Sequence, residues 1–179
     1  SITLRPVTAP DGTPVNATIR GDSGTMATFE GDANVTVRNL TLTDYWTAID
    51  GNGLTRNGSL TVHDTTVDSQ AEYDNPGIEV RHSGATVTLV GSEITGSYTG
   101  LSGTGASGNW TVRRTVIHDT DDTHFFAAES SGTFTVEDSR FVGNDHGDGI
   151  TASHNNARGS GTWKITNTTI ETYDMGWAF

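Results

Sequence analysis

The chain has 179 residues, of which 32% are hydrophobic and 22 are glycine, and its 22 acidic and 10 basic side chains give a formal net charge of −12. This length fits one domain, and the charge argues against nucleic acid as a partner because a phosphate backbone requires a basic surface. Without cysteine, or any apolar run long enough to cross a bilayer, disulfides, thiol chemistry and membrane insertion are not expected.

The first part of the chain, residues 1–33, contains the short β-type stretches ITLRP, NATIRGD and TMATFEGD. They predict one irregular first coil. From residue 34 a nine-residue element recurs six times, with copies that begin at Asn34, Ser59, Thr86, Asn109, Thr133 and Thr162. A spacing in the twenties with β-type residues indicates one turn of a solenoid per copy.

Apolar residues occupy the second, fourth and ninth positions of the element, so we expect three buried columns. The second-position column is Val35, Leu60, Val87, Trp110, Phe134 and Trp163. The fourth-position column is Val37, Val62, Leu89, Val112, Val136 and Ile165. The ninth-position column is Leu42, Val67, Ile94, Ile117, Phe141 and Ile170.

The alternation slips between the fourth and seventh positions, which predicts a corner between two strands. The corner residues, most of which tolerate a bent backbone, are Asn39, Asp64, Gly91, Arg114, Asp138 and Asn167. The seventh position should form a mainly hydroxyl-bearing column that satisfies itself from coil to coil, namely Leu40, Thr65, Ser92, Thr115, Ser139 and Thr168.

A further strand follows each element after a variable loop. We expect the inward residues of these strands to form a fourth column, namely Ile49, Ile78, Leu101, Phe126, Ile150 and Trp177. A glycine usually precedes the inward residue, and we interpret it as the residue that lets the chain turn sharply into the strand.

The stretches NVTVRNLTLTD and DHGDGITAS resemble repeats of the pectate-lyase-like right-handed parallel β-helix superfamily, and the similarity covers essentially the whole chain. The resemblance implies an all-β fold, a single-stranded right-handed parallel β-helix of about seven coils. Residues 1–179 would form one domain, with six regular coils over residues 34–179. The superfamily includes lyases, hydrolases, tailspikes and adhesins, so the resemblance implies no single function.

One face of the third strand brings chemistry-bearing residues together. Asp50 and Glu79 should lie one coil step apart, with Arg81 nearby. Paired carboxylates can act as general acid and base or hold Ca²⁺. A solvated acidic face is the alternative interpretation.

Two acidic loops, DTDDTH and NDHGD, precede the third strands of neighbouring coils, and their acidic residues are Asp119, Asp121, Asp122, Asp145 and Asp148. With His124 and His146 they form the densest acid and histidine cluster in the sequence. Oxygen ligands favour Ca²⁺ as the cation such a cluster would hold, although polar turn chemistry also explains these residues. No other cofactor is expected.

Six Asn-x-Ser/Thr sequons provide candidate glycosylation sites, at Asn16, Asn34, Asn39, Asn57, Asn109 and Asn167. The acidic surface, with Lys164 as the single lysine, resembles proteins of haloarchaea, while a secreted protein of a high-GC bacterium remains the alternative. The chain shows no signal peptide and begins in what looks like a strand, so we expect a mature or trimmed segment of a secreted protein, on a cell surface or a virion.

The catalytic sets of the superfamily's enzymes are largely missing. GNDHGDG, from Gly143, resembles hydrolase fragments, but the chain lacks Gly-His-Gly and Arg-x-Lys. We therefore expect a non-catalytic structural or adhesion module with a possible carbohydrate ligand, and keep a polysaccharide lyase or glycoside hydrolase using Asp50, Glu79 and Arg81 as the alternative. Open solenoid ends also predict self-association or a flanking domain there.

Overall fold

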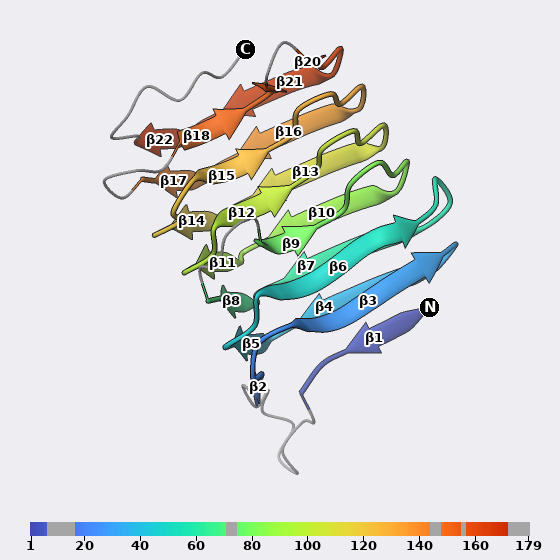
Figure 1. The fold of residues 1–179 in the computed structure, drawn as a ribbon, viewed down its shortest axis with the longest axis vertical. Helices are drawn as coiled ribbons and strands as arrows, with labels where there is room; N and C mark the ends of the chain where they lie inside the picture. The colour runs from blue at the N-terminus through green and yellow to red at the C-terminus, as the bar shows by residue number, and fades with distance from the viewer. Residues whose placement is uncertain (7–16, 71–74, 144–147, 155–156, 172–179) are drawn as a thin grey trace.

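The computed structural model describes residues 1–6, 17–70, 75–143, 148–154 and 157–171. Within these ranges all regular structure is β-strand, and all strands except one short pair form three parallel sheets. Figure 1 shows the coils stacked along one axis, from the N-terminal coil to the C-terminal coil.

Sheet 1 contains β1 (Ile2–Leu4), β4 (Asn34–Arg38), β7 (Ser59–His63), β10 (Thr86–Val90), β13 (Asn109–Arg113), β16 (Thr133–Glu137) and β21 (Thr162–Thr166). Sheet 2 contains β2 (Ala17–Arg20), β5 (Leu40–Thr43), β8 (Thr66–Asp68), β11 (Glu93–Thr95), β14 (Val116–His118), β17 (Arg140–Val142) and β22 (Thr169–Glu171). Sheet 3 contains β3 (Thr25–Gly31), β6 (Thr47–Leu54), β9 (Pro76–Glu79), β12 (Thr99–Ser102), β15 (Thr123–Phe126) and β18 (Asp148–Thr151).

The predicted parallel solenoid is confirmed. Because the smallest of the three sheets has 6 strands, the described chain completes about six turns. The first coil follows the register of the later ones, with Ile2 beside Val35 and Ala17 beside Leu40, and its irregularity is a shift between Thr28 and Glu30. A short antiparallel pair, β19 (Ser153–His154) with β20 (Ala157–Arg158), is an addition that the repeat did not predict.

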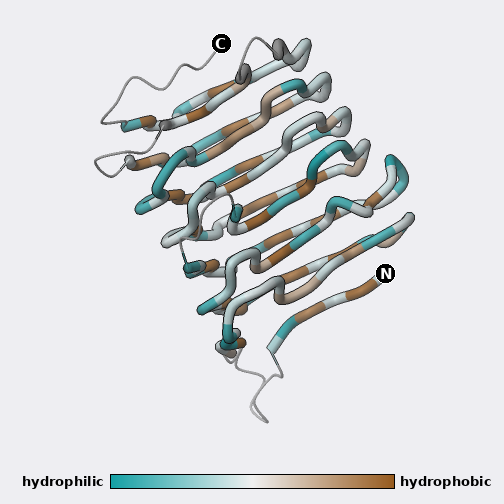
Figure 2. Tube along the Cα trace, viewed as in Figure 1, coloured by the Kyte–Doolittle hydropathy of each residue, from teal (hydrophilic) through white to brown (hydrophobic). Residues whose placement is uncertain are grey.

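The three predicted core columns of sheets 1 and 2 are confirmed as buried except in the last described coil, where Trp163 and Ile165 are half-buried and Ile170 is exposed. In the fourth-position column, for example, Val37 pairs with Val62, and Val112 pairs with Val136. These side chains are fully buried. Figure 2 shows the resulting alternation of hydrophobic and hydrophilic positions along each coil. The apolar columns therefore supply a continuous core along the axis.

Large aromatic side chains fill the core toward the C-terminal coils. Trp110, Phe134 and Trp163 stack in one column, with ring centroids 6.2 Å and 4.6 Å apart. The Phe125 ring packs against all three, at 5.3 Å from both tryptophan rings. Such ring pairs contribute about 0.5–1.5 kcal/mol beyond the area they bury.

The predicted inward position of Phe126 is wrong. Phe125 is the residue that lies between Leu101 and Ile150 in sheet 3 and is fully buried, whereas Phe126 lies in the outward row beside Ser102. A slip of one residue exchanges the two faces of a strand, and here the aromatic core cluster selects Phe125. The predicted member Trp177 lies outside the described residues.

The glycines of this strand also have a different role from the one predicted. Gly77 and Gly100 lie inside β9 and β12 without a positive φ. A Cβ atom at Gly100 would lie 2.6 Å from the His124 carbonyl oxygen and 2.6 Å from the Ile117 side chain. The strand therefore needs glycine for close packing between and within coils.

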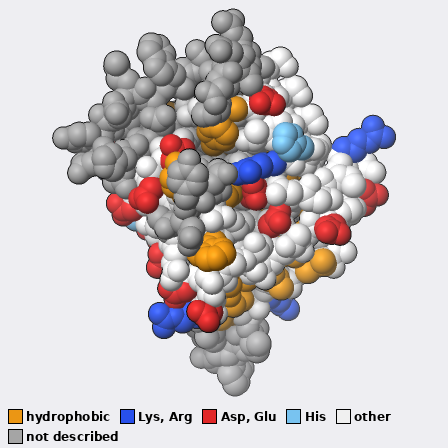
Figure 3. Space-filling model, viewed as in Figure 1, with side chains coloured by type: hydrophobic (Ala, Val, Ile, Leu, Met, Phe, Trp, Pro, Cys, Tyr) orange, Lys and Arg blue, Asp and Glu red, His pale blue; other side chains and the backbone are white. Residues whose placement is uncertain are grey.

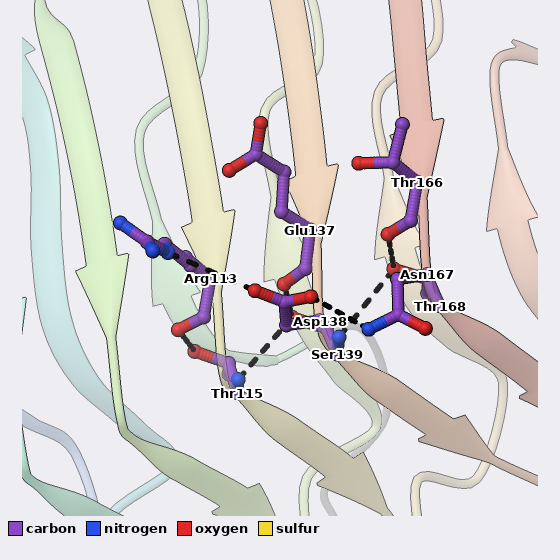
Figure 4. Close-up of polar contacts among 8 residues, drawn as sticks. All are labelled: Arg113, Thr115, Glu137, Asp138, Ser139, Thr166, Asn167 and Thr168. Carbon is purple, nitrogen blue, oxygen red and sulfur yellow. Dashed lines mark hydrogen bonds and ion pairs between the residues drawn. The ribbon is translucent and has the colours of Figure 1, made fainter.

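The corner between sheets 1 and 2 is confirmed. All six predicted corner residues have φ between 46° and 63°, in the left-handed region. The following hydroxyl column connects neighbouring coils, as Figure 4 shows. Ser139 Oγ donates to the Glu137 carbonyl at 2.7 Å and accepts from the Thr115 amide at 3.2 Å, while the Ser139 amide donates to Thr168 Oγ1 at 3.4 Å. Buried backbone groups at the bend are thereby satisfied.

Candidate functional site

The outward face of sheet 3 brings together the predicted acid, base and cation. Asp50 and Glu79 are register partners on β6 and β9, so they lie one coil step, about 4.8 Å, apart along the backbone. The next member of this row is Ser102 on β12. The predicted convergence of Asp50, Glu79 and Arg81 on one face is therefore present in the structure.

Hydrogen bonds within this cluster engage most of its polar groups. Arg81 Nε contacts Glu79 Oε1 in an ion pair and lies 3.0 Å from Ser102 Oγ. The Arg81 amide donates to Asn52 Oδ1 at 2.6 Å, and Asp50 Oδ1 accepts from the Asn52 amide at 2.9 Å. Asn52, which lies beside this row, thus connects the Asp50 carboxylate to the Arg81 backbone.

The cluster is partly covered rather than free. The side chain of Glu79 is 12% exposed and that of Arg81 is 31% exposed. A carboxylate that accepts from a guanidinium is poorly suited to carry the proton that a general acid donates. The arrangement is better suited to present a fixed pattern of hydrogen-bonding groups than to move a proton.

The outward row continues past this cluster. It contains Phe126 on β15 and Thr151 on β18, after Ser102. Phe126 is half-buried, so an aromatic surface lies in the same row as the charged residues. The row therefore combines carboxylates, a guanidinium and an aromatic ring, while the hydroxyl-bearing residues Ser102 and Thr151 are buried.

The structure describes only part of the predicted metal cluster. Asp119, Asp121 and Asp122 lie in the loop before β15, where Asp122 Oδ2 accepts from Thr123 Oγ1 at 3.0 Å. Asp145 and His146 lie outside the described residues, and only the backbone of Asp148 is described. Across the described ranges, no group of three Asp, Glu or His side chains converges to form a metal site. The calcium site stays a prediction.

His124, the described histidine of that cluster, is buried in the core. It occupies the position of Gly100 in the next coil, and its ring stacks on Phe141 with centroids 6.3 Å apart. Its side chain therefore belongs to the interior of the solenoid rather than to a surface loop.

A histidine that the sequence analysis did not single out makes the polar contacts instead. His118 Nδ1 lies 2.7 Å from Asp119 Oδ2, and His118 Nε2 lies 3.0 Å from Glu93 Oε1 in the preceding coil. Burial lowers the pKa of His118, but the hydrogen bonds to Glu93 and Asp119 outweigh it and leave this pKa above its ordinary value. The in-register pairing of β11 with β14 is the signal from which the sequence could have placed His118 near Glu93.

The asparagines of four sequons lie at exposed positions, Asn34, Asn57, Asn109 and Asn167. Asn39 is half-buried at the corner, and Asn16 lies outside the described residues. Exposure is necessary for glycosylation but does not by itself identify a modified residue.

On the face shown in Figure 3, acidic side chains are spread among uncharged ones, with only a few basic groups between them. No helix in the described part of the chain has the length and apolar character needed to span a bilayer.

Comparison with known proteins gives one family. A family model described as a right handed beta helix region matches residues 8–170. No curated protein and no solved structure matches the chain significantly. The family match therefore adds that the helical coil of the chain is right-handed, and none of the comparisons adds an activity.

Proposed function

Because the chain belongs to the right-handed β-helix family, whose fold supports unrelated activities, we propose its function from the sheet 3 face: a non-catalytic extracellular adhesion module that binds carbohydrate. One observation carries this proposal. The charged groups of Asp50, Glu79 and Arg81 lie in one row with Phe126, and they are held by hydrogen bonds within the cluster.

This combination suits a sugar surface. Arg81 and the carboxylates offer donors and acceptors to hydroxyl groups, and the half-buried Phe126 lies in the same row. Successive coils place these groups about 4.8 Å apart, so an extended polysaccharide running along the axis would meet several of them. The ligand class that fits is a hydroxyl-rich polymer chain.

Binding is tested by affinity electrophoresis or pull-down with neutral and acidic polysaccharides. The Arg81→Gln variant should lose binding severalfold, because it removes the guanidinium that holds Glu79 and Ser102. Arg113→Gln is the matched control, since Arg113 lies on sheet 1. Equal binding by both variants would contradict the sheet 3 face as the binding surface.

The alternative, a polysaccharide lyase or hydrolase, is favoured by the single coil step between Asp50 and Glu79. The same polysaccharides are incubated with the chain and assayed for unsaturated or reducing ends. Turnover that Glu79→Gln abolishes would establish the alternative and reject the non-catalytic role. We expect no turnover above a buffer control.

The proposal includes a partner at the coil ends. Among the described residues the exposed large hydrophobic side chains are Ile2, Ile19 and Ile170, at 44%, 37% and 37% exposure. Each lies on a strand with a neighbour on one side only within its described sheet. Another coil, from a second copy or a flanking domain, would cover these groups. A monodisperse monomer in sedimentation would argue against the second copy.

A further inference from the structure

Two sequons are placed differently from the others because each lies within one strand of sheet 1. Asn34 and Thr36 lie on β4, and Asn109 and Thr111 lie on β13. Residues i and i+2 of a strand point to the same face, so amide and hydroxyl both face solvent. Both asparagines are exposed and both threonines are half-exposed. A transferase approaching this face would meet the two sequon groups together.

The sequons at the corner lack this arrangement. Asn39 and Asn167 adopt left-handed backbone conformations, with φ of 54° and 46°. Their sequon hydroxyls, on Thr41 and Thr169, lie beyond the corner on β5 and β22 of sheet 2. Amide and hydroxyl are therefore presented on different faces of the solenoid.

Hydrogen bonding separates the asparagines further. The side-chain amide nitrogen Nδ2 of Asn167 donates to Asp138 Oδ1 at 2.7 Å (Figure 4), and Asn57 Nδ2 donates to Asp32 Oδ2 at 3.4 Å. These bonds engage the atom that glycosylation modifies. Ser59 Oγ, by contrast, donates to Asn34 Oδ1 at 2.8 Å and leaves Asn34 Nδ2 unengaged by the described residues.

The Asn109 side chain is exposed and makes no hydrogen bond to any described part of the chain. Its neighbour Trp110 points inward and is buried in the aromatic core cluster. The residue is thus exposed on a strand whose next side chain is firmly packed. Of the described sequons, it combines exposure, an amide without a hydrogen bond to the described residues and a hydroxyl on the same face.

We propose that Asn109 and Asn34 are the N-glycosylation sites of the folded chain. The donor is a lipid-linked oligosaccharide diphosphate. Its anomeric carbon forms a bond to Asn Nδ2, the carbon–oxygen bond to phosphate breaks, the amide proton passes to a base of the transferase, and the lipid diphosphate leaves. The inference rests on the proposed function only for its extracellular setting.

The two sites share one face. β4 and β13 are separated by β7 and β10, so the asparagines lie three strand steps, about 14 Å, apart. Glycans there would cover the outer surface of sheet 1 and leave the outward row of sheet 3 open for ligand. Modification and binding would thus occupy different sides of the solenoid.

The test uses the folded full chain, a purified single-subunit oligosaccharyltransferase without further sequon requirements, and lipid-linked oligosaccharide. Glycopeptide mass spectrometry measures occupancy at each asparagine, and urea-unfolded chain serves as the reference. We expect severalfold higher occupancy at Asn109 and Asn34 than at Asn57 and Asn167. Occupancy at Asn167 equal to that at Asn109, or modification of the unfolded chain alone, would overturn the proposal.

Two variants test separately the role of the sequon hydroxyl and the role of the hydrogen bond that engages the asparagine amide. Thr111→Val removes the sequon hydroxyl and should abolish occupancy at Asn109 while leaving Asn34 unchanged. Asp138→Ala releases Asn167 Nδ2 and should raise occupancy at Asn167. Unchanged occupancy there would contradict protection by the hydrogen bond. The assay needs no carbohydrate ligand, so its failure leaves binding by sheet 3 untouched.

Discussion

Replacing Ser139 by alanine should destabilise the corner more than its single missing oxygen suggests. Ser139 is buried, and its hydroxyl makes two bonds: it donates to the Glu137 carbonyl and accepts from the Thr115 amide. The Glu137 carbonyl keeps a second donor, the Arg114 amide at 3.1 Å, but the Thr115 amide keeps no other bond within the described ranges. One buried N–H is therefore orphaned.

The expected loss of stability follows from the contrast between the Glu137 carbonyl, which keeps a partner, and the Thr115 amide, which does not. An orphaned buried donor costs about 1–3 kcal/mol, and the lost hydroxyl bond contributes about 1 kcal/mol, so Ser139→Ala should lower the free energy of unfolding by about 2–4 kcal/mol. Thr115→Val removes one donor to the Arg113 carbonyl, which still accepts from the Gly91 amide at 3.0 Å. That variant should cost about 1 kcal/mol because it orphans no backbone group.

Urea unfolding followed by circular dichroism measures the free energies, and amide hydrogen exchange reports on the Thr115 N–H directly. Ser139→Thr is the matched control, since threonine occupies this column at Thr65, Thr115 and Thr168. It should stay within about 1 kcal/mol of the parent chain. A loss for Ser139→Ala no larger than for Thr115→Val, with unchanged exchange at Thr115, would refute the reasoning.

Arg114→Asn should raise the free energy of unfolding by about 1 kcal/mol, because Arg114 has φ 47° and asparagine tolerates the left-handed region; a lower urea midpoint would contradict this. Gly100→Ala should cost about 1–3 kcal/mol in the same assay, and more than Gly77→Ala, whose Cβ would meet nothing closer than 3.1 Å; the reverse order would be inconsistent with the packing argument. His118→Gln should flatten stability against pH. The raised pKa of His118 contributes stability that is fully present below the unfolded value of about 6.5 and is lost as pH rises through the folded value, so parallel pH profiles of the two proteins would reject the His118 contacts.

The core columns could be predicted because the alternation of period two and the repeat in the twenties are both visible in the sequence. The corner residues were found by aligning copies, which explains why even Arg114, an unusual residue for a left-handed bend, was placed correctly. Stacking in register then carries each assignment from one coil to the next.

Prediction failed where two neighbouring residues were equally suitable. In FFAAE, hydrophobicity cannot choose between Phe125 and Phe126, and only packing against Trp110 and Trp163 decides. His124 was misplaced by the same shift, since the residue before the inward phenylalanine takes the close-packed position of Gly100. The convergence of Asp50 and Glu79 was predictable from register, but the hydrogen bonds through Asn52 depend on side-chain geometry.

The ladder bonds between coils also determine how the chain would respond to a pulling force. Tension applied along the solenoid axis would load each coil interface in series, so coils should detach one after another. A coil of 25 residues, such as the one that begins at Asn34 and ends before Ser59, would release roughly 85 Å of contour length. Coils of unequal length would give steps of unequal size, and a force–extension trace could assign each rupture to a particular coil.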